Sequence, residues 1–337
     1  MQAIVQDTYG SPDVLELREI DKPAIADDEL LVRVHAAGVD PGVWHLMTGL
    51  PYLVRVMGAA YRPRKAPVRG VDVAGRVEAV GAKVTEFQEG DELFGTCNGS
   101  FAEYVCVKER ERSRAPWRFA HELAPKPANL TFEQAAAVPV SACAALHGLR
   151  DRGEVRAEQR VLIIGAGGGV GTFAVQLAKA FGAQVTGVCS TTKLDLVRSI
   201  GADNVIDHTR EDFADGRHRY DVILDTAGRR SLSHLRRALT PRGTLVIVGG
   251  EGGGRWLGGF QRIILAAPML SLFVSQRLRG LTSAERKEDL QFLTELIEAG
   301  RVMPVIDRTY PLSEAPDAIR YLHGGHARGK VVITVDS

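Results

Sequence analysis

Five glycines are crowded into the segment VLIIGAGGGVGTF, residues 161–173, near the middle of the 337-residue chain. They are Gly165, Gly167, Gly168, Gly169 and Gly171, and four apolar residues precede them. A turn without side chains lets another molecule approach the backbone, and a helix that begins there presents unpaired N–H groups and the positive end of its dipole. These are the features of a site for an anion, above all a phosphate.

The spacing of these glycines only approximates the G-x-G-x-x-G pattern of dinucleotide-binding turns, because Ala166, Gly168 and Gly171 fit it with alanine in the first place. A flexible linker or a close helix–strand packing contact could have the same composition. The flanking elements decide between these interpretations, since the pattern has meaning only between a strand and a helix.

Strand and helix patterns alternate after residue 160. Short β-branched runs predict strands at 161–164, 184–188, 204–207, 220–228 and 243–250, and apolar periodicity predicts helices at 172–183, 193–200 and 230–240. This alternation predicts an α/β domain with a doubly wound parallel sheet. The glycines fall at its first strand-to-helix turn, so we expect them to bind the pyrophosphate of a dinucleotide.

The second strand of that sheet indicates which dinucleotide is bound. An NAD site normally has an acidic residue there for the ribose 2′-hydroxyl, but residues 185–193 contain none. Ser190, Thr191 and Lys193 instead offer hydroxyl donors and a cation for a 2′-phosphate. NADPH is therefore favoured over NADH, with the alternative that Lys193 merely caps a solvated helix.

Composition excludes several other classes of function. A net charge of +1 gives no field that would gather nucleic acid or anionic lipid. The four cysteines are scattered and form no C-x-x-C pair, and the start MQAIVQDTYG has no basic, apolar leader, so we expect a reducing, cytoplasmic setting. The apolar run 257–274 is short for a membrane span and contains Gln261 and Arg262, which favours a pocket wall or a subunit contact.

The first 125 residues predict a compact β-rich unit, because short β runs are separated by turns rich in Gly, Pro and Asp. The tail GKVVITV, from Gly329, is one more strand without a following helix, and we expect it to return to this unit. The predicted domains are therefore 1–128, completed by 281–337, and 129–280.

Several segments, in order along the whole chain, resemble the medium-chain dehydrogenase/reductase superfamily, and within it the zinc-free quinone oxidoreductase-like branch. They are AAGVDPGVWHLMTG, PVRGVDVAGRVEAVG, FAEYV, AAAVPVSACAALHGL, GAGGGVG, GADNVID and LDTAG. The resemblance implies a GroES-like substrate domain, a Rossmann cofactor domain and a homodimer. It also implies that the nicotinamide meets the substrate between the two domains.

The resemblance also implies a set of cofactor-binding residues. These are Gly165, Ala166, Gly167, Gly168, Gly169 and Val170 at the pyrophosphate, Asp225, Thr226 and Gly228 at the ribose, and Val248, Gly249 and Gly250 at the nicotinamide. Asp40 stands where relatives often have Asn beside the nicotinamide, but an ionised Asp cannot donate a hydrogen bond. Cys143 replaces a common Thr and fits a small buried hydrophobe better. His208 replaces a Tyr that contacts the adenosine phosphate, and an ordinary surface residue is an equal interpretation.

The implied reaction is hydride transfer from NADPH to an electron-poor acceptor, a quinone or an α,β-unsaturated carbonyl compound. Tyr52 is the first candidate for proton donor or substrate clamp, although a packed ring is an alternative, and His45 is the second; Asp40 completes the catalytic candidates. The apolar segment Leu270–Val274 is a candidate edge strand for the homodimer. The glycine-rich segment 249–259 is a candidate lid or a plain surface loop, and the basic segments 62–69 and 108–114 are interpreted as solvated faces.

No zinc is expected. Zinc-dependent relatives hold the metal at positions that match Asp40, then Val71 and Asp72, then Pro139, and only the two aspartates could be ligands. Only Cys97 and Cys106 lie where relatives have four structural zinc cysteines. His323 and His326 flank two glycines, which favours a turn over a metal site. An alcohol dehydrogenase and a non-catalytic NADPH-binding protein remain the alternatives.

Overall fold

The computed structural model describes residues 1–57, 68–109, 121–249, 255–259, 266–271 and 273–335. The chain forms two compact units. One comprises Met1–Cys143, Ala284–Gly300 and Pro304–Ser337, and the other comprises Ala144–Ser283 and Arg301–Met303. The boundary between them falls inside helix α4 (Pro139–Leu146), after Cys143.

The second unit contains a six-stranded sheet whose neighbouring strands all run parallel. Its strands are β8 (Arg160–Ile164), β9 (Gln184–Cys189), β10 (Asn204–Asp207), β11 (Tyr220–Asp225), β12 (Leu239–Ile247) and β13 (Arg277–Gly280). Their order is β10-β9-β8-β11-β12-β13, so the chain reverses direction across the sheet between β8 and β11. The predicted doubly wound α/β sheet is confirmed, and ligands of such sheets bind at the carboxyl ends of the strands beside the reversal.

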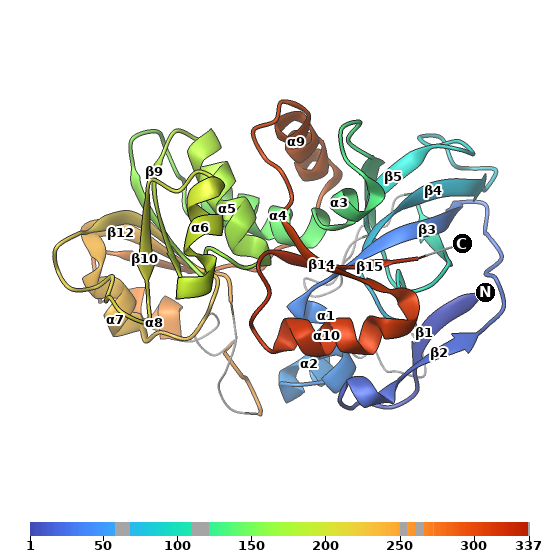
Figure 1. Cartoon of the computed structure of the whole chain (residues 1–337), viewed down its shortest axis with the longest axis horizontal. Coiled ribbons are helices and arrows are strands. Elements are labelled where there is room, and N and C mark those ends of the chain that lie inside the picture. Colours follow the sequence, from blue (N-terminus) through green and yellow to red (C-terminus); the bar gives the residue numbers. More distant parts are fainter. Residues whose placement is uncertain (58–67, 110–120, 250–254, 260–265, 272, 336–337) are drawn as a thin grey trace. The chain divides into compact units, whose positions relative to one another are not determined.

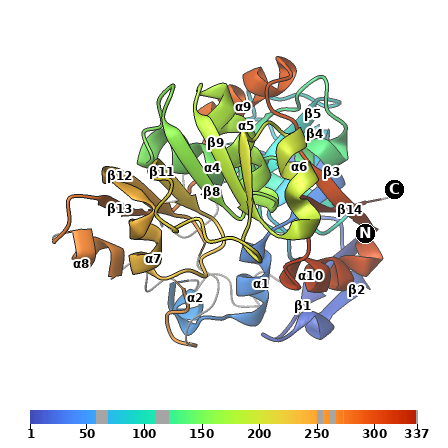
Figure 2. The same ribbon diagram turned by 60° about the vertical axis from the view of Figure 1, so that its left-hand side comes forward.

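Helices cover both faces of this sheet. They are α5 (Gly169–Ala180), α6 (Leu194–Ser199), α7 (Leu232–Arg237) and α8 (Ala267–Ser271), with a π-helix at His147–Arg152 and a 3-10 turn at Thr191–Lys193. Figure 2 shows α5 and α6 on one side and α7 and α8 on the other. α5 buries Phe173, Ala174, Leu177 and Ala178, the residues whose helical spacing predicted it.

Two features of this unit differ from the sequence-based expectations. The candidate edge strand Leu270–Val274 is wrong, because Leu270 and Ser271 end helix α8. The described edge strand on that side is β13, which pairs with β12 through Leu278 opposite Leu245. Short apolar runs fit a strand and a buried helix equally well, which explains the error. No helix in the described ranges has the length and apolar character of a membrane span.

The first unit is built on a seven-stranded sheet that contains both early and late parts of the chain. Its strands are β3 (Glu29–Val39), β4 (Asp72–Val80), β5 (Glu92–Thr96), β6 (Tyr104–Lys108), β7 (Glu122–Pro125), β14 (Ile306–Pro311) and β15 (Lys330–Thr334). The order is β14-β15-β3-β4-β5-β7, with β6 also paired to β3. Figure 1 shows the red strands β14 and β15 beside the blue β3. The expected return of the tail strand to the β-rich unit is therefore confirmed.

Smaller elements complete the first unit. They are the hairpin of β1 (Gln2–Gln6) and β2 (Leu15–Glu19), 3-10 turns at Pro12–Val14 and Leu312–Glu314, and helices α1 (Pro41–Thr48), α2 (Tyr52–Met57), α3 (Phe132–Ala136), α9 (Lys287–Glu298) and α10 (Ala315–His323). Thr131 starts α3 with a capping box, in which its side chain accepts from the Gln134 N–H and the Gln134 side chain accepts from the Thr131 N–H. Apolar side chains from the sheet and from α1 and α10 form one buried core.

Candidate functional site

The glycine turn lies at the carboxyl end of β8 and leads into α5. Gly168 is the N-cap of α5 and supplies no side-chain cap, so the first N–H groups of this 12-residue helix face outward without a protein side chain on them. A Cβ added to Gly168 would meet only the Gly165 carbonyl oxygen, at 3.4 Å. A Cβ on Gly171 would lie 2.1 Å from that same oxygen. The turn is therefore tightly packed inside and open outside, as a phosphate cradle must be.

The carboxyl end of β11 is tied to the ends of both neighbouring strands. The Thr226 hydroxyl donates to the Ile164 carbonyl at the end of β8, at 2.8 Å. The backbone N–H groups of Val248 and Gly249 donate to the Asp225 carbonyl at 2.9 and 3.1 Å. The Asp225 carboxylate is fully buried and accepts from the Gly228 N–H at 3.0 Å. The chain segments expected at the ribose and nicotinamide thus meet at one edge of the sheet.

A second group of polar side chains lies at the carboxyl ends of β9 and β10. The Thr191 hydroxyl donates to Asp207 Oδ2 at 2.5 Å, so its single proton is not available to a phosphate. The stem of Lys193 lies against the glycine turn, since a Cβ on Gly167 would be 2.8 Å from Lys193 Cδ. The His208 N–H donates to the Cys189 carbonyl, and its side chain is exposed. The Thr191 hydroxyl is thus engaged within the protein, and the stem of Lys193 lies beside the glycine turn.

Four side chains of the first unit meet in a buried charged cluster, which we call the Lys330 cluster: Asp40, Asp72, Ser141 and Lys330. Lys330 Nζ donates to Asp40 Oδ1 at 2.6 Å and to Asp72 Oδ2 at 3.1 Å. It also donates to Ser141 Oγ at 3.2 Å, and that hydroxyl donates to Asp40 Oδ1 at 3.0 Å. Lys330 is 2% exposed, Asp40 5% and Asp72 0%. All three ammonium N–H donors are used inside the protein, as a buried cation requires.

Strand register brings this cluster together. β15 runs antiparallel to β3 with Val331 opposite Val39, which sets Lys330 beside Asp40. Asp72 begins β4, the other neighbour of β3. Gly38 on β3 makes room for it, because a Cβ there would lie 2.6 Å from Asp72 Oδ2. The cluster therefore links three adjacent strands.

Charge inside the cluster is unevenly shared. Burial opposes the ionisation of Asp40, but the Lys330 ammonium outweighs it and the pKa of Asp40 lies below its ordinary value. Burial and the neighbouring Asp40 charge raise the pKa of Asp72 well above its ordinary value. The pKa of Lys330 is raised by both carboxylates in spite of burial. The pKa values of the two carboxyl groups around this one ammonium are thus shifted in opposite directions.

The remaining catalytic candidates, His45 and Tyr52, lie on α1 and α2, and the cofactor-binding candidate Cys143 lies on α4. The His45 Nδ1 donates to the Leu50 carbonyl at 2.7 Å, which fixes the proton of the neutral ring on Nδ1. Tyr52 begins α2, and the Arg55 guanidinium lies 5.0 Å from the centre of its ring. Cys143 is fully buried in α4, in keeping with its interpretation as a small hydrophobe.

Two family models match the chain: the alcohol dehydrogenase GroES-like domain over residues 26–116 and a zinc-binding dehydrogenase domain over residues 200–333. The chain is 33% identical to a 2-methylene-furan-3-one reductase of Solanum lycopersicum, over 99% of this chain and 79% of that protein. It is also 33% identical to an NADPH-dependent alkenal/one oxidoreductase of Arabidopsis thaliana, with the same coverage. A quinone oxidoreductase structure from Coxiella burnetii superposes with a TM-score of 0.82 at 27% identity, over 100% and 99% of the two chains.

The chain belongs to the quinone oxidoreductase-like branch of the medium-chain dehydrogenase/reductase superfamily. It is accordingly an oxidoreductase with a GroES-like and a Rossmann domain, as the resemblance implied.

Asp40 and Asp72, which the resemblance matched to zinc-ligand positions, meet in the Lys330 cluster around an ammonium group. Within the described residues, no three His, Cys, Asp or Glu side chains gather as metal ligands would. Sequence reasoning missed Lys330 and Ser141. One signal in the sequence could have revealed Lys330: it is a lone lysine at the start of the buried strand KVVIT. A lysine buried in this way needs a buried anion as its partner.

Other expected features are placed differently or fall outside the described residues. His323 ends α10 and stacks on Trp44 with ring centroids 3.5 Å apart, which gives it a packing role. Three segments lie outside the described residues: 250–254 of the candidate lid, which includes Gly250, 62–67 of the segment 62–69, and 110–114 of the segment 108–114.

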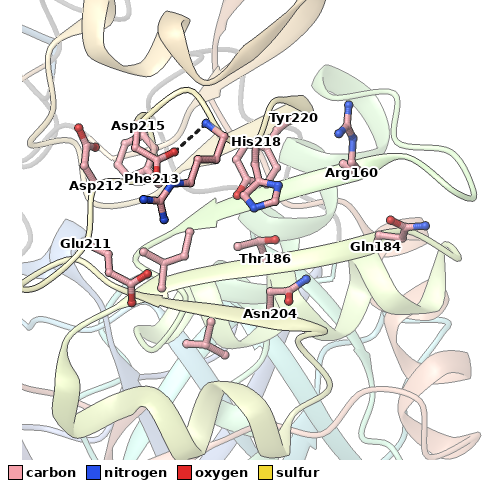
Figure 3. Close-up of a pocket in the computed structure, with 13 residues that line it drawn as sticks. Arg160, Gln184, Thr186, Asn204, Glu211, Asp212, Phe213, Asp215, His218 and Tyr220 are labelled. Carbon is pink, nitrogen blue, oxygen red and sulfur yellow. Dashed lines mark hydrogen bonds and ion pairs between the residues drawn. The ribbon is translucent and has the colours of Figure 1, made fainter.

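A cavity of about 380 Å³ opens at the opposite ends of the Rossmann strands. Figure 3 shows the first residues of β8, β9, β10 and β11 around it: Arg160, Gln184, Asn204 and Tyr220. It is lined at the amino ends of the strands, whereas ligands of such sheets bind at the carboxyl ends. This cavity is therefore separate from the cofactor edge.

Proposed function

We propose that the protein is an NADPH-dependent, zinc-free reductase of quinones or α,β-unsaturated carbonyl compounds. The observation that carries the proposal is the open glycine turn at the point of strand reversal, with the stem of Lys193 packed on it. Two similar proteins support the proposal, since one is named an NADPH-dependent alkenal/one oxidoreductase and the other a quinone oxidoreductase.

The residues at the carboxyl edge of the Rossmann sheet fit a nicotinamide dinucleotide. The cradle formed by Gly165–Val170 would receive the pyrophosphate, and Asp225, Thr226, Val248 and Gly249 would line the ribose and nicotinamide. Ser190 and Lys193 would meet a 2′-phosphate, with His208 at its rim, which is why NADPH is preferred to NADH. When bound, the cofactor supplies a hydride.

The Lys330 cluster supports a zinc-free mechanism. Its two carboxyl groups already surround a cation that is covalently part of the chain, and Lys330 is 2% exposed. A zinc ion there would have to displace the ammonium and bind through oxygen alone, whereas catalytic zinc sites have three protein ligands, mostly imidazole or thiolate. Without a metal to acidify an alcohol, an activated acceptor is the better substrate.

Tyr52 is the proposed proton donor. A neutral His45 keeps its proton on Nδ1, in a hydrogen bond to Leu50, so its Nε2 can only accept. The Tyr52 hydroxyl can donate a proton, and the Arg55 guanidinium, 5.0 Å from the centre of its ring, would stabilise the negative charge left behind. Reduction of an unsaturated carbonyl needs such a proton, because hydride addition leaves an enolate.

A homodimer and a cytoplasmic location remain part of the proposal. Near the described sheet edge at β13, Phe273 is 82% exposed and Met269 64%, which is the kind of apolar surface that a subunit contact covers. We also propose that residues 1–128 with 281–337 bind the substrate and that 129–280 bind the cofactor.

A substrate screen tests the function. The purified protein is assayed with NADPH and a set of small quinones and enones, and separately with alcohols and NADP⁺. Turnover in the first set alone supports the proposal. Turnover of alcohols alone would identify an alcohol dehydrogenase, and NADPH binding without any turnover would identify a non-catalytic binding protein.

A further inference from the structure

We infer that Asp207 is a positioning residue for recognition of the cofactor 2′-phosphate, acting through Thr191 on the turn that carries Lys193. The inference rests on the proposed function, because it concerns the adenosine end of the same cofactor edge. Asp207 belongs to no dinucleotide-binding motif in the sequence, and it lies on β10 rather than on β9, where an acidic ribose ligand would be expected.

Both carboxylate oxygens of Asp207 accept hydrogen bonds, and the side chain is buried in the protein. Its Oδ2 accepts the Thr191 hydroxyl at 2.5 Å, and its Oδ1 accepts the Thr209 hydroxyl at 2.7 Å and the Thr209 N–H at 3.0 Å. It is 4% exposed. A carboxylate in this state is not free to receive a ribose hydroxyl, so its contribution to binding is indirect.

The Thr191 contact is a tether between two neighbouring strand ends. Asp207 is paired in register with Cys189, the last residue of β9. Two residues later the chain enters the 3-10 turn Thr191–Lys193, whose N-cap Ser190 makes no side-chain cap hydrogen bond. The hydrogen bond to Asp207 holds this turn to β10, and the Thr209 hydroxyl, 3.3 Å from that of Thr191, adds a longer contact.

Lys193 depends on the position of that turn. Its Cβ, Cγ and Cδ atoms lie 2.8–3.3 Å from the point where a Gly167 Cβ would be, so the stem crosses the glycine turn at close range. A small rotation of the 3-10 turn would lift the stem from Gly167 and move the ammonium away from the phosphates. Precise placement matters because a charge-assisted hydrogen bond weakens steeply with poor geometry.

The negative charge of Asp207 has a cation beside it. The Thr191 and Thr209 hydroxyl donors lower the pKa of Asp207 to about 2, so it is ionised, but Arg210 Nε lies 3.8 Å from its Oδ2. The Arg210 side chain is 74% exposed, so a cation lies on the solvent side of the buried carboxylate and partly offsets its charge.

The experiment measures binding of the adenosine part of the cofactor alone. Calorimetric titration gives the dissociation constants of 2′,5′-ADP and 5′-AMP for the full-length protein, and their ratio reports recognition of the 2′-phosphate. We expect Thr191→Val to reduce the preference for 2′,5′-ADP by about tenfold, with 5′-AMP affinity changed less than about twofold. Thr191→Ser keeps the hydroxyl and should restore the preference.

Two further variants separate positioning from general loosening. Thr209→Val removes a hydroxyl bond to Asp207 Oδ1 and leaves the Thr191–Asp207 bond in place, although the Thr209 hydroxyl also lies 3.3 Å from that of Thr191. The ratio should therefore fall less than in Thr191→Val. In an Asp207→Ala background the tether is already gone, so adding Thr191→Val should change nothing more.

The outcomes distinguish the inference from the function on which it rests. If the unmodified protein binds both nucleotides equally, NADPH preference is wrong and the role of Asp207 falls with it. If the preference is present but survives Thr191→Val, or is lost equally in Thr209→Val, the positioning role alone is overturned.

Discussion

Removal of the Lys330 charge tests how the first unit tolerates two buried carboxyl groups. Lys330→Met keeps the length of the side chain and removes its three donors. Asp40 and Asp72 then lose the ammonium group that donates to them at 2.6 and 3.1 Å. Both residues stay buried, since neither is more than 5% exposed. Breaking a buried ion pair from one side costs about 3–5 kcal/mol, which lowers the melting temperature of a domain of this size by about 6–20 °C.

The pH dependence of this loss follows from the carboxyl groups. Without the ammonium, the pKa of Asp40 is no longer held down, and burial raises it as it already raises that of Asp72. Groups whose pKa is raised by folding favour the folded state at low pH and lose that contribution as pH rises through the folded pKa. The deficit of Lys330→Met should therefore be larger at pH 8 than at pH 5, by about 1.4 kcal/mol for each unit by which the pKa of Asp40 in the folded variant lies above 5.

Urea denaturation followed by tryptophan fluorescence at both pH values measures the deficit. Lys83→Met is the matched control, because the Lys83–Asp27 pair has a similar 3.1 Å distance but side chains 72% and 65% exposed, and its removal should cost less than about 0.5 kcal/mol. Adding Asp40→Asn to Lys330→Met should recover part of the loss. A deficit no larger than the control, or one equal at pH 5 and pH 8, would refute the description of the cluster.

Three further predictions concern the cofactor and the metal. Gly168→Val should abolish NADPH binding in a fluorescence titration and leave the melting temperature unchanged. Gly171→Val should instead fail to fold, because its Cβ would lie 2.1 Å from a backbone oxygen. A folded Gly168→Val protein with normal NADPH affinity would mean that the phosphate lies elsewhere. Lys193→Ala should weaken NADPH by about 1.5–3 kcal/mol and leave NADH unchanged, and equal losses for both would contradict a 2′-phosphate contact. Elemental analysis of protein purified without added metal should find less than stoichiometric zinc, and chelators should leave quinone reduction intact; zinc whose removal stops turnover would reverse the assignment.

The Rossmann half of the fold could be predicted because its information is local. Each strand is a short apolar run and each helix an amphipathic segment, and the glycine turn marks where the first pair begins. β13 was not predicted, because RLRG is an edge strand with two arginines and lacks the apolar run of the central strands. The segment Leu270–Val274 was assigned wrongly because its four apolar residues carry no period that separates helix from strand.

The Lys330 cluster could not be predicted because its information is not local. Asp40, Asp72, Ser141 and Lys330 stand alone in the sequence, and 290 positions separate the first from the last. Only strand register joins them. Thr191 shows the same limit on a smaller scale, since its hydroxyl was expected to meet a phosphate and instead donates to Asp207, 16 residues away. Residue types indicated which chemistry was present, and only the tertiary structure showed which groups were already satisfied.

The late position of β15 in the chain has a consequence for synthesis on the ribosome. Asp40 and Asp72 emerge early, but the lysine that neutralises them is the first residue of the last strand. The second unit has nearly all of its residues by Ser283 and can close its parallel sheet while the first is still incomplete. Until residue 330 emerges, the nascent first unit must either expose both aspartates to water or bury them as protonated acids. Its final packing therefore waits until Lys330 has emerged, and a chain truncated before Lys330 should leave the first unit incompletely packed.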